Sequence, residues 1–296
     1  MKGLRKYDTL LFFLFIAPWI IGFITFFLIP FGTSVFYAFT DARLPGAVTY
    51  QFVGLDNFVE MTNDSIFLKS LFNTLYFVVF GVPVVTIGML LLALLLNMNI
   101  KGIALFRTFY YLPTLVPIVA TVIIWRLVFN SEFGILNAAL GSIGISKIDW
   151  LGGEHTIKPV IILLQVWISG SGVLIFLAAL KNVPRHLYEA VEIDGAGKVR
   201  SFFSITLPMI SPSILFVVII QTMYNFQLFT ESLLLSRGGP NYASYTFVYS
   251  IYKSTFTDLK FSMAMSQSIF LFILIAVVTW ILMKISNRVV YYEGDK

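Results

Sequence analysis

The chain has 296 residues, of which 58% are hydrophobic and 12% are charged, with a formal net charge of +5 and no cysteine. A soluble domain of average composition carries about 25% charged residues, so this composition points to an integral membrane protein. The lack of cysteine in this sequence excludes disulfide scaffolds, cysteine-based metal sites and thiol catalysis. Its positive charges stand near the ends of apolar runs, which is typical of membrane topology signals and not of a nucleic-acid-binding groove.

Six apolar runs are each long enough to cross a bilayer as a helix, which takes about 20 residues. The first, at residues 10–28, follows a basic start and exceeds the apolar core of a signal peptide, about 7–15 residues, so we expect a retained membrane helix. Glycine and proline at positions 81–83 are expected to break the second run in its middle. The other spans are expected at residues 70–96, 109–129, 159–180, 209–235 and 261–283.

The connections between these runs complete the predicted organisation. An outer loop is expected at 41–69, with room for a short helix, and a short polar turn at 97–107. The pattern predicts an all-α integral membrane protein with six transmembrane helices and a helical loop between the fourth and fifth. Its predicted parts are an N-terminal helix with its outer loop at 1–69, a five-helix core at 70–284 that includes the polar loop 181–212, and a tail at 285–296.

Basic residues indicate which side of the membrane each loop faces, because short cytoplasmic loops are enriched in Lys and Arg. Six spans place both termini on one side, and twelve of the twenty Lys and Arg residues fall on that side. The acidic residues divide in the opposite sense, with six on the side of the termini and nine on the other. We therefore expect cytoplasmic termini, and the polar loop 181–212 is then cytoplasmic as well.

This polar loop has the pattern of two short helices joined by a glycine. Leu187, Ala190 and Val191 form an apolar stripe on the first helix. Gly195 is typical of a helix end, because glycine tolerates the left-handed backbone conformation found there. A second helical run is expected from residue 198 to about 205. The pattern alone fits equally well an amphipathic linker that lies on the lipid headgroups.

Neutral polar side chains occur inside the predicted spans. One face of the fifth span, by the i, i+3, i+4, i+7 rule, carries Gln221, Tyr224, Asn225 and Leu228. The fourth span adds a weaker set, Gln165, Ser169 and Ser171. Amides offer paired donors and acceptors to hydroxyls, and an aromatic ring can stack on a pyranose, so these residues would suit a neutral polyhydroxylated solute. The alternative is that amides and serines hold neighbouring helices together.

Three short runs of the polar loop resemble the EAA signature of the permease subunits of type I ABC importers. They are Glu189-Ala190-Val191, Asp194-Gly195-Ala196 and Ile205-Thr206-Leu207-Pro208. Residues 106–137 and 233–256 are similar to the carbohydrate-uptake branch of that family, within it to the sugar and glycerol-phosphate permeases that pair with a second permease. The resemblance covers most of the chain, from about residue 70 to 284.

The resemblance implies a function and a set of partners. The loop would be a coupling loop seated on a cytoplasmic ATPase through Leu187, Tyr188, Glu189, Ala190, Val191, Asp194, Gly195 and Ala196. The partners implied are a second homologous permease, two copies of the ABC ATPase and an extracytoplasmic solute-binding protein. The regions around 165–171 and 224–226 would contact a sugar. ATP and Mg²⁺ would be bound by the ATPase, so no cofactor is expected on this chain. The resemblance also implies that the chain lies in the cell membrane of a bacterium or archaeon.

The sequence offers little for chemistry of its own. It contains neither the ATP-binding GxxxxGK[ST] loop nor the HExxH metal motif, and we expect no catalytic activity and no metal site. His155 and His186 are expected on opposite sides of the membrane. We also expect the six spans to carry no ionisable side chain, the kind of group that ion-coupled carriers usually need at membrane depth. An ion-gradient-driven carrier, or an ABC permease for a solute that is not a sugar, remains the alternative.

Overall fold

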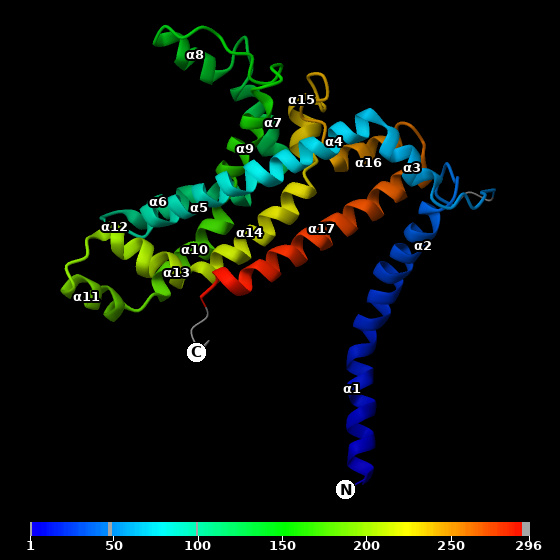
Figure 1. Ribbon diagram of the computed structural model, residues 1–296, viewed down its shortest axis with the longest axis horizontal. Coiled ribbons are helices and arrows are strands. Elements are labelled where there is room, and N and C mark those ends of the chain that lie inside the picture. Colours follow the sequence, from blue (N-terminus) through cyan, green and yellow to red (C-terminus); the bar gives the residue numbers. More distant parts are fainter. Residues whose placement is uncertain (1, 47–48, 99, 292–296) are drawn as a thin grey trace. The chain divides into compact units, whose positions relative to one another are not determined.

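The computed structural model of the protein describes residues 2–46, 49–98 and 100–291, and the regular structure within these ranges is helical (Figure 1). The described part contains an isolated antiparallel bridge, between Thr40 and Phe52, and no longer strand. The chain divides into two compact units, Met1–Asp64 with Ile251–Phe272, and Ser65–Ser250 with Ile273–Lys296. The tail predicted at 285–296 extends beyond residue 291, so its last five residues lie outside the described part.

The first unit begins with a long helical segment. Its candidate membrane span, Leu11–Ala38, has 28 residues and is longer than the predicted 10–28. Pro30 does not end this span, because it directly follows a π-helical turn in which the Ile29 N–H donates to the Ile24 carbonyl, and such a turn accommodates the hydrogen bond that proline cannot make. The elements are α1 (Lys2–Phe23), a π-helical turn (Ile24–Leu28), α2 (Ile29–Ala38) and, within the predicted outer loop, α3 (Asp56–Asn63).

The second unit holds most of the remaining helices. Its first half comprises α4 (Ser65–Tyr76), a π-helical turn (Phe77–Gly81), α5 (Val82–Leu96), α6 (Ile103–Tyr111), a 3-10 turn (Leu112–Leu115), α7 (Ile118–Val128) and α8 (Ile135–Ser142). Its second half comprises α9 (Ile157–Trp167), α10 (Gly170–Asn182), α11 (Arg185–Ile193), α12 (Lys198–Ser201), a π-helical turn (Phe202–Thr206), α13 (Leu207–Met209), α14 (Ser211–Phe226) and α15 (Thr230–Ser236). Two further helices, α16 (Phe247–Phe256) and α17 (Phe261–Val289), each begin in one unit and end in the other.

Six spans are obtained when bent helix pairs are counted as single crossings, as the sequence predicts. Three spans are continuous helices: Leu11–Ala38, Ser65–Leu96 and Phe261–Ser286. The other three are pairs bent by 104°, 52° and 66°, namely Ile103–Leu115 with Ile118–Val128, Ile157–Trp167 with Gly170–Asn182, and Lys198–Met209 with Ser211–Phe226. The sharpest bend lies at Val116 and Pro117, because a residue that precedes proline is driven out of the helical conformation and Val116 is extended.

Two sequence-based expectations about breaks in the chain are wrong. The second span was expected to break at positions 81–83, but a π-helical turn at Phe77–Gly81 carries the helix through. Pro83 directly follows this turn, in which the Val82 N–H donates to the Phe77 carbonyl five residues back, and such a π-helical turn accommodates the hydrogen bond that proline cannot make. The polar turn expected at 97–107 is shorter, since α6 begins at Ile103.

The core of the second unit forms around α5, which packs against α9, α10 and α14. Gly172 on α10 permits the close approach of α10 to α5, because a Cβ atom at this position would lie only 2.4 Å from the Met89 sulfur. Small residues at such contacts are the usual means of bringing membrane helices together. Met89, Phe77 and Phe176 are fully buried in the resulting cluster. The helices that carry the candidate site residues are therefore fixed against one central helix.

Candidate functional sites

The polar loop between the fourth and fifth spans contains what we call the hinge segment, residues 185–206. It consists of α11, α12 and the π-helical turn that follows α12, as the two-helix pattern predicts. On α11, Leu187 and Val191 of the predicted apolar stripe are half-buried and pack against the core cluster, together with Tyr188. Ala190, the third residue of the predicted stripe, is instead exposed, as is Glu189, so the stripe was only partly predicted. One side of α11 is thus anchored to the protein, and the other is open.

The turn between α11 and α12 is a Schellman motif. Gly195 has a left-handed φ of +77°, as expected from the sequence. Its N–H donates to the carbonyl oxygen of Glu192 at 3.0 Å, and the N–H of Ala196 donates to that of Val191 at 3.1 Å. These are the two hydrogen bonds that define this helix ending, and Asp194 is the C-cap. Glycine is favoured here because a residue with a Cβ strains the left-handed conformation.

The hinge segment is connected to the fifth span by side-chain and backbone contacts. The Tyr188 hydroxyl of α11 lies 2.8 Å from the Thr206 hydroxyl of the π-helical turn. Helical structure then continues from Lys198 to Met209, so this hydrogen bond links α11 to the beginning of the fifth span. A cavity of about 480 Å³ lies between α11 and α12 with the π-helical turn that follows it, and its lining includes Tyr188 and Glu192.

Two apolar side chains on the open face of the hinge segment are unusually exposed. Ile193 is 86% exposed and Val199 is 73% exposed, and both lie close to the Gly195 turn. The charged residues around them are exposed as well: Arg185, Glu189, Glu192, Asp194, Lys198 and Arg200. Apolar side chains ringed by charges are a common feature of protein interaction surfaces.

The predicted solute-path residues do not form one group. Gln165 on α9 and Asn225 on α14 are both buried, and the Gln165 amide donates from Nε2 to Asn225 Oδ1 at 3.1 Å. Asn225 Nδ2 in turn donates to the backbone carbonyl of Gln221 at 2.9 Å. A Cβ added at Gly81 would lie 3.3 Å from Asn225 Oδ1, so a third element closes over this pair. We call this arrangement the amide contact; its geometry matches the alternative in which amides hold helices together.

The serines of the fourth span are separated from each other by the bend between α9 and α10. Ser169 is buried; its hydroxyl donates to the Val166 carbonyl at 2.6 Å and lies 3.2 Å from the Tyr110 hydroxyl. Ser171 is exposed two residues later. The two side chains therefore have different surroundings, and Ser169 belongs to the packing of α6 against the bend.

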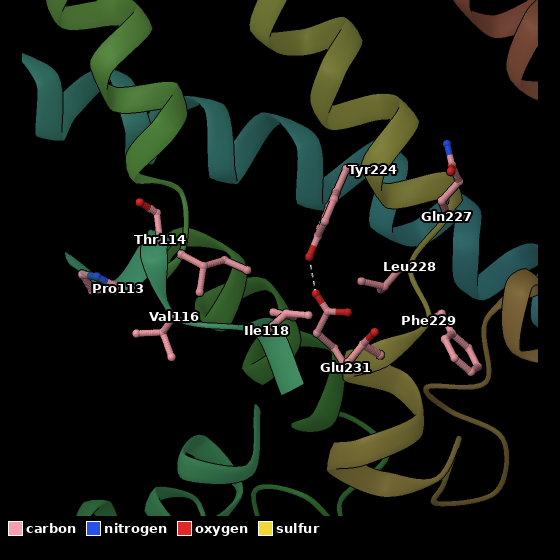
Figure 2. Close-up of a pocket in the computed structure, with 11 residues that line it drawn as sticks. Pro113, Thr114, Val116, Ile118, Tyr224, Gln227, Leu228, Phe229 and Glu231 are labelled. Atoms are coloured by element: carbon pink, nitrogen blue, oxygen red, sulfur yellow. Dashed lines mark hydrogen bonds between the residues drawn. The ribbon is translucent and has the colours of Figure 1, made fainter. Parts of the chain in front are cut away.

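Tyr224 and Leu228 border a cavity that we call the α14 pocket. It has a volume of about 320 Å³, and Figure 2 shows the Tyr224 side chain pointing into it toward Glu231. Since α14 ends at Phe226, Leu228 is not on the predicted helical face, although it borders the same cavity as Tyr224. The pocket is lined by Pro113, Thr114, Val116, Ile118, Ile168, Tyr224, Gln227, Leu228, Phe229, Thr230 and Glu231.

Glu231 corrects the expectation that the predicted spans carry no ionisable side chain, although it lies on α15, beyond Phe226, where the fifth span ends in the structure. This residue falls inside the predicted span 209–235, is 2% exposed, and accepts a hydrogen bond at Oε1 from the Tyr224 hydroxyl at 2.5 Å. Arg126 also falls inside a predicted span, in the last turn of α7, where it is exposed. The signal for Glu231 was present in the sequence, because it is the one carboxylate in the run 209–235.

Hydrogen bonds to the loop after α15 hold the pocket wall in place. The Thr246 hydroxyl donates to the Leu228 carbonyl at 2.6 Å, and the Ser232 hydroxyl donates to the Ser244 carbonyl. From α4, Asn73 Nδ2 donates to the carbonyls of Tyr242 and Tyr245 at 2.7 and 2.9 Å. The loop is thereby tied both to α15 and to the second span, so the position of Glu231 is set by several independent contacts.

Comparisons with known proteins agree with this architecture. Residues 59–292 match the family model of the inner membrane component of binding-protein-dependent transport systems. The chain is 39% identical over 300 residues to YesP of Bacillus subtilis, a probable ABC transporter permease, covering 100% of this chain and 96% of that one. It is 35% identical to AraP of the same organism, a permease of arabinooligosaccharide transport, covering 96% and 90%.

A solved structure gives the same fold. It is that of a bacterial ABC transporter of the acidic polysaccharide alginate, in complex with a periplasmic protein bound to an alginate pentasaccharide. The TM-score is 0.82 at 24% identity, with 97% of each chain covered. Since the family model covers most of the described spans and two relatives exceed 30% identity over nearly the whole chain, this protein belongs to the inner membrane components of binding-protein-dependent transport systems.

Proposed function

We propose that this chain forms part of the translocation path of an ATP-driven importer for a sugar or sugar-like solute. The observation that carries the coupling half of the proposal is the hinge segment, with its exposed charged face, its Schellman turn at Gly195 and its link to the fifth span through Tyr188 and Thr206. A cytoplasmic ATPase bound to this face would move α11, and α11 would pull on the start of the fifth span.

The solute half of the proposal is supported by the α14 pocket and by the relatives. AraP is named for arabinooligosaccharide transport, and the structural neighbour for alginate, so both act on carbohydrates. The pocket combines a half-exposed tyrosine ring with hydroxyl and amide groups from Thr114, Gln227 and Thr230. An aromatic ring beside neutral hydrogen-bonding groups is suited to a sugar. Its volume of about 320 Å³ is at the lower end of small-molecule sites, which span about 300–1,000 Å³.

The proposal includes the partners that this chain lacks. A second homologous permease would complete the path, and two copies of a cytoplasmic ATPase would bind and hydrolyse ATP with Mg²⁺, so that this chain catalyses nothing itself. A solute-binding protein outside the cell membrane would deliver the solute. The termini and the hinge segment would face the cytoplasm, as the distribution of basic residues favours. Closure of the ATPases on ATP would then shift the spans between inward-open and outward-open states.

Glu189 provides the test of coupling. It is exposed on the open face of α11, where it can make a charge-assisted contact with an ATPase. In the complete transporter reconstituted in vesicles, we expect Glu189→Ala to reduce ATP-dependent uptake of neutral oligosaccharides on the order of tenfold, since a hydrogen bond to a charged group contributes about 1.5–3 kcal/mol. Stimulation of ATP hydrolysis by the solute-loaded binding protein should fall in parallel.

The controls separate loss of coupling from loss of the protein. Glu189→Asp keeps the charge and should recover part of the uptake, while the amount of complex purified from the membrane should be the same for all three proteins. Uptake at the parental rate by Glu189→Ala would contradict the coupling role of α11. Uptake that proceeds in vesicles without ATP would instead indicate an ion-gradient-driven carrier.

A further inference from the structure

We infer that the α14 pocket selects neutral polyhydroxylated solutes against anionic ones such as uronates and sugar phosphates, with Glu231 as the selecting residue. The inference rests on the proposed function, in that the pocket is taken to lie on the path of the solute. It goes further in naming the charge class that the path accepts, and in assigning this selectivity to a side chain that sequence analysis did not single out.

The charge of the pocket wall is the first observation. Figure 2 draws eleven lining residues of the pocket. Apart from the Tyr224 phenol, the ionisable group among them is the carboxyl of Glu231. The remaining lining side chains are apolar or neutral and polar. Proteins that bind carboxylates or phosphates supply Arg, Lys or a set of backbone N–H groups for them. The described wall supplies the carboxyl group of Glu231 instead.

Basic side chains are present on the surrounding elements, but none of them borders the cavity. On α7, Ile118 lines the pocket, and Arg126 lies eight residues further along, which is about 12 Å along a helix axis. On α6, the Arg107 guanidinium donates to the Leu96 carbonyl at 2.7 and 3.0 Å. The remaining basic residues on these elements and in the turn after α15 are also absent from the cavity lining; they are Lys158, Lys181 and Arg237.

The position of Glu231 is fixed, and this is the second observation. Its carboxyl is buried and accepts the Tyr224 hydroxyl at 2.5 Å, and α15 is held by the loop contacts described above. A carboxylate has about four acceptor sites, so it can accept a sugar hydroxyl in addition to the tyrosine. In this inference Glu231 is ionised, with its charge stabilised by the hydrogen bond from Tyr224, so a uronate or phosphate, which has acceptor oxygens there instead, would bring a second negative charge and be repelled.

The Tyr224 ring adds the third observation. The residue is 38% exposed, so its ring can contact a solute while its hydroxyl is engaged by Glu231. Hydrogen bonding to Glu231 orients the ring, which can then stack on the apolar face of a pyranose. Neutral sugars gain from both residues, whereas an anionic sugar gains from the ring and is repelled by the carboxylate.

The test uses the fact that the chain has no cysteine. Thr114→Cys places a single thiol of nearly the same size on the pocket wall. In the assembled transporter we would measure its reaction rate with two methanethiosulfonate reagents of similar size, the cationic trimethylammonium-ethyl and the anionic sulfonato-ethyl compound. Background from the partner chains is measured with the cysteine-free parent. We expect the cation-to-anion rate ratio to exceed that of a thiol in solution roughly tenfold, because a nearby carboxylate concentrates cations.

Glu231→Gln is the matched variant, since glutamine has the same shape and can still accept the Tyr224 hydrogen bond. In Thr114→Cys combined with Glu231→Gln, we expect the rate ratio to fall to about that of the free thiol. A control cysteine at Ser142, an exposed residue of α8 outside the pocket lining, should give the same ratio with and without Glu231→Gln. A Thr114→Cys ratio no higher than that of the free thiol would overturn the inference without need of the second variant, as would a ratio that Glu231→Gln leaves unchanged.

Uptake measurements distinguish failure of this inference from failure of the proposed function. Sugar uptake by the parent transporter together with an unchanged rate ratio would retain the proposed function and overturn the selectivity. In the supporting case, Glu231→Gln raises the uptake of an acidic oligosaccharide relative to a neutral one roughly tenfold. The binding protein is the same in both transporters, so its own preference cancels from this comparison.

Discussion

The hinge segment and the amide contact are both polar, yet they use their polar groups in opposite ways. In the hinge segment the charged side chains face outward from α11 and α12. In the amide contact Gln165 and Asn225 face each other across two helices, and both are buried. Groups of the first kind are available to another protein, whereas those of the second kind are bonded within this one, apart from the buried Gln165 Oε1, which has no hydrogen-bond partner among the described residues.

The difference shows why residue type alone does not identify a functional site in a membrane protein. A buried polar group left without a partner costs about 1–3 kcal/mol, so paired amides at membrane depth stabilise helix packing before they can serve a solute. Tyr224 immediately precedes Asn225 on α14, yet its side chain borders the α14 pocket. Neighbouring residues on a helix point about 100° apart, and here this separates a helix-packing contact from the wall of a cavity.

The largest effect is expected from Gly195→Val in the hinge segment. A residue with a Cβ in the left-handed conformation costs roughly 1–2 kcal/mol, and a β-branched one costs more. No atom lies within 4 Å of the position of the added Cβ, so the strain is confined to the backbone. The Schellman turn should therefore open, and ATP-dependent uptake in reconstituted vesicles should fall roughly tenfold or more while membrane insertion is unchanged.

The chain supplies a matched control for this substitution. Gly197 lies two residues away, also has no atom within 4 Å of an added Cβ, and has an ordinary φ of −74°. Gly197→Val should therefore retain most of the uptake. Gly195→Asn should be intermediate, because asparagine tolerates the left-handed region better than valine. Equal uptake by Gly195→Val and Gly197→Val would show that the geometry of the turn has no part in coupling.

The amide contact should respond to mutation as a pair. Gln165→Leu or Asn225→Leu alone leaves one buried amide without its partner, and each should lower the unfolding free energy of the purified complex by about 1 kcal/mol. The double variant replaces both groups by apolar ones and should be less destabilised than the sum of the two single variants. Thermal unfolding in detergent measures all four proteins of this cycle.

Transport measurements sharpen the same cycle. If the amide contact serves packing, the uptake of each variant should follow its unfolding free energy. The double variant should then regain part of both its stability and its uptake. A double variant that is stable and assembled but does not transport would place Gln165 and Asn225 on the solute path, and the contrast with the hinge segment would then no longer hold.

The fold was predictable from the sequence where local chemistry decides it. The six spans follow from apolar runs, and the half-buried Leu187 and Val191 of α11 and the left-handed Gly195 follow from helix periodicity and glycine's backbone freedom. The bends at residues 116–117 and 168–169 were not predicted. The first bend arises because Pro117 keeps Val116 out of the helical conformation. The rest of that span has the same apolar composition as a straight span and gives no other sign of the bend.

The candidate sites were less predictable because they depend on contacts between distant residues. Sixty positions separate Gln165 from Asn225, and periodicity says which residues share a face but not which helix that face meets. Glu231 could not be placed beside Tyr224 from the sequence, because the run 209–235 has the pattern of one uninterrupted helix. In the structure α14 ends at Phe226, and the chain turns so that Glu231 comes back to Tyr224.

The smallest effect is expected from Tyr188→Phe, which tests the connection between the exposed hinge segment and the buried part of the protein. This variant removes the hydroxyl that lies 2.8 Å from Thr206 and keeps the ring that packs against the core. A single neutral hydrogen bond contributes about 1 kcal/mol, so uptake should fall about fivefold. ATP hydrolysis should fall less than uptake, because α11 can still bind the ATPase but transmits its motion to the fifth span less tightly. Thr206→Val removes the same hydrogen bond from the other side and should give the same ratio of uptake to hydrolysis, with no further loss in the double variant. Additive losses in the double variant would mean that the two hydroxyls act separately, and that α11 moves the fifth span through the backbone of residues 194–201 instead.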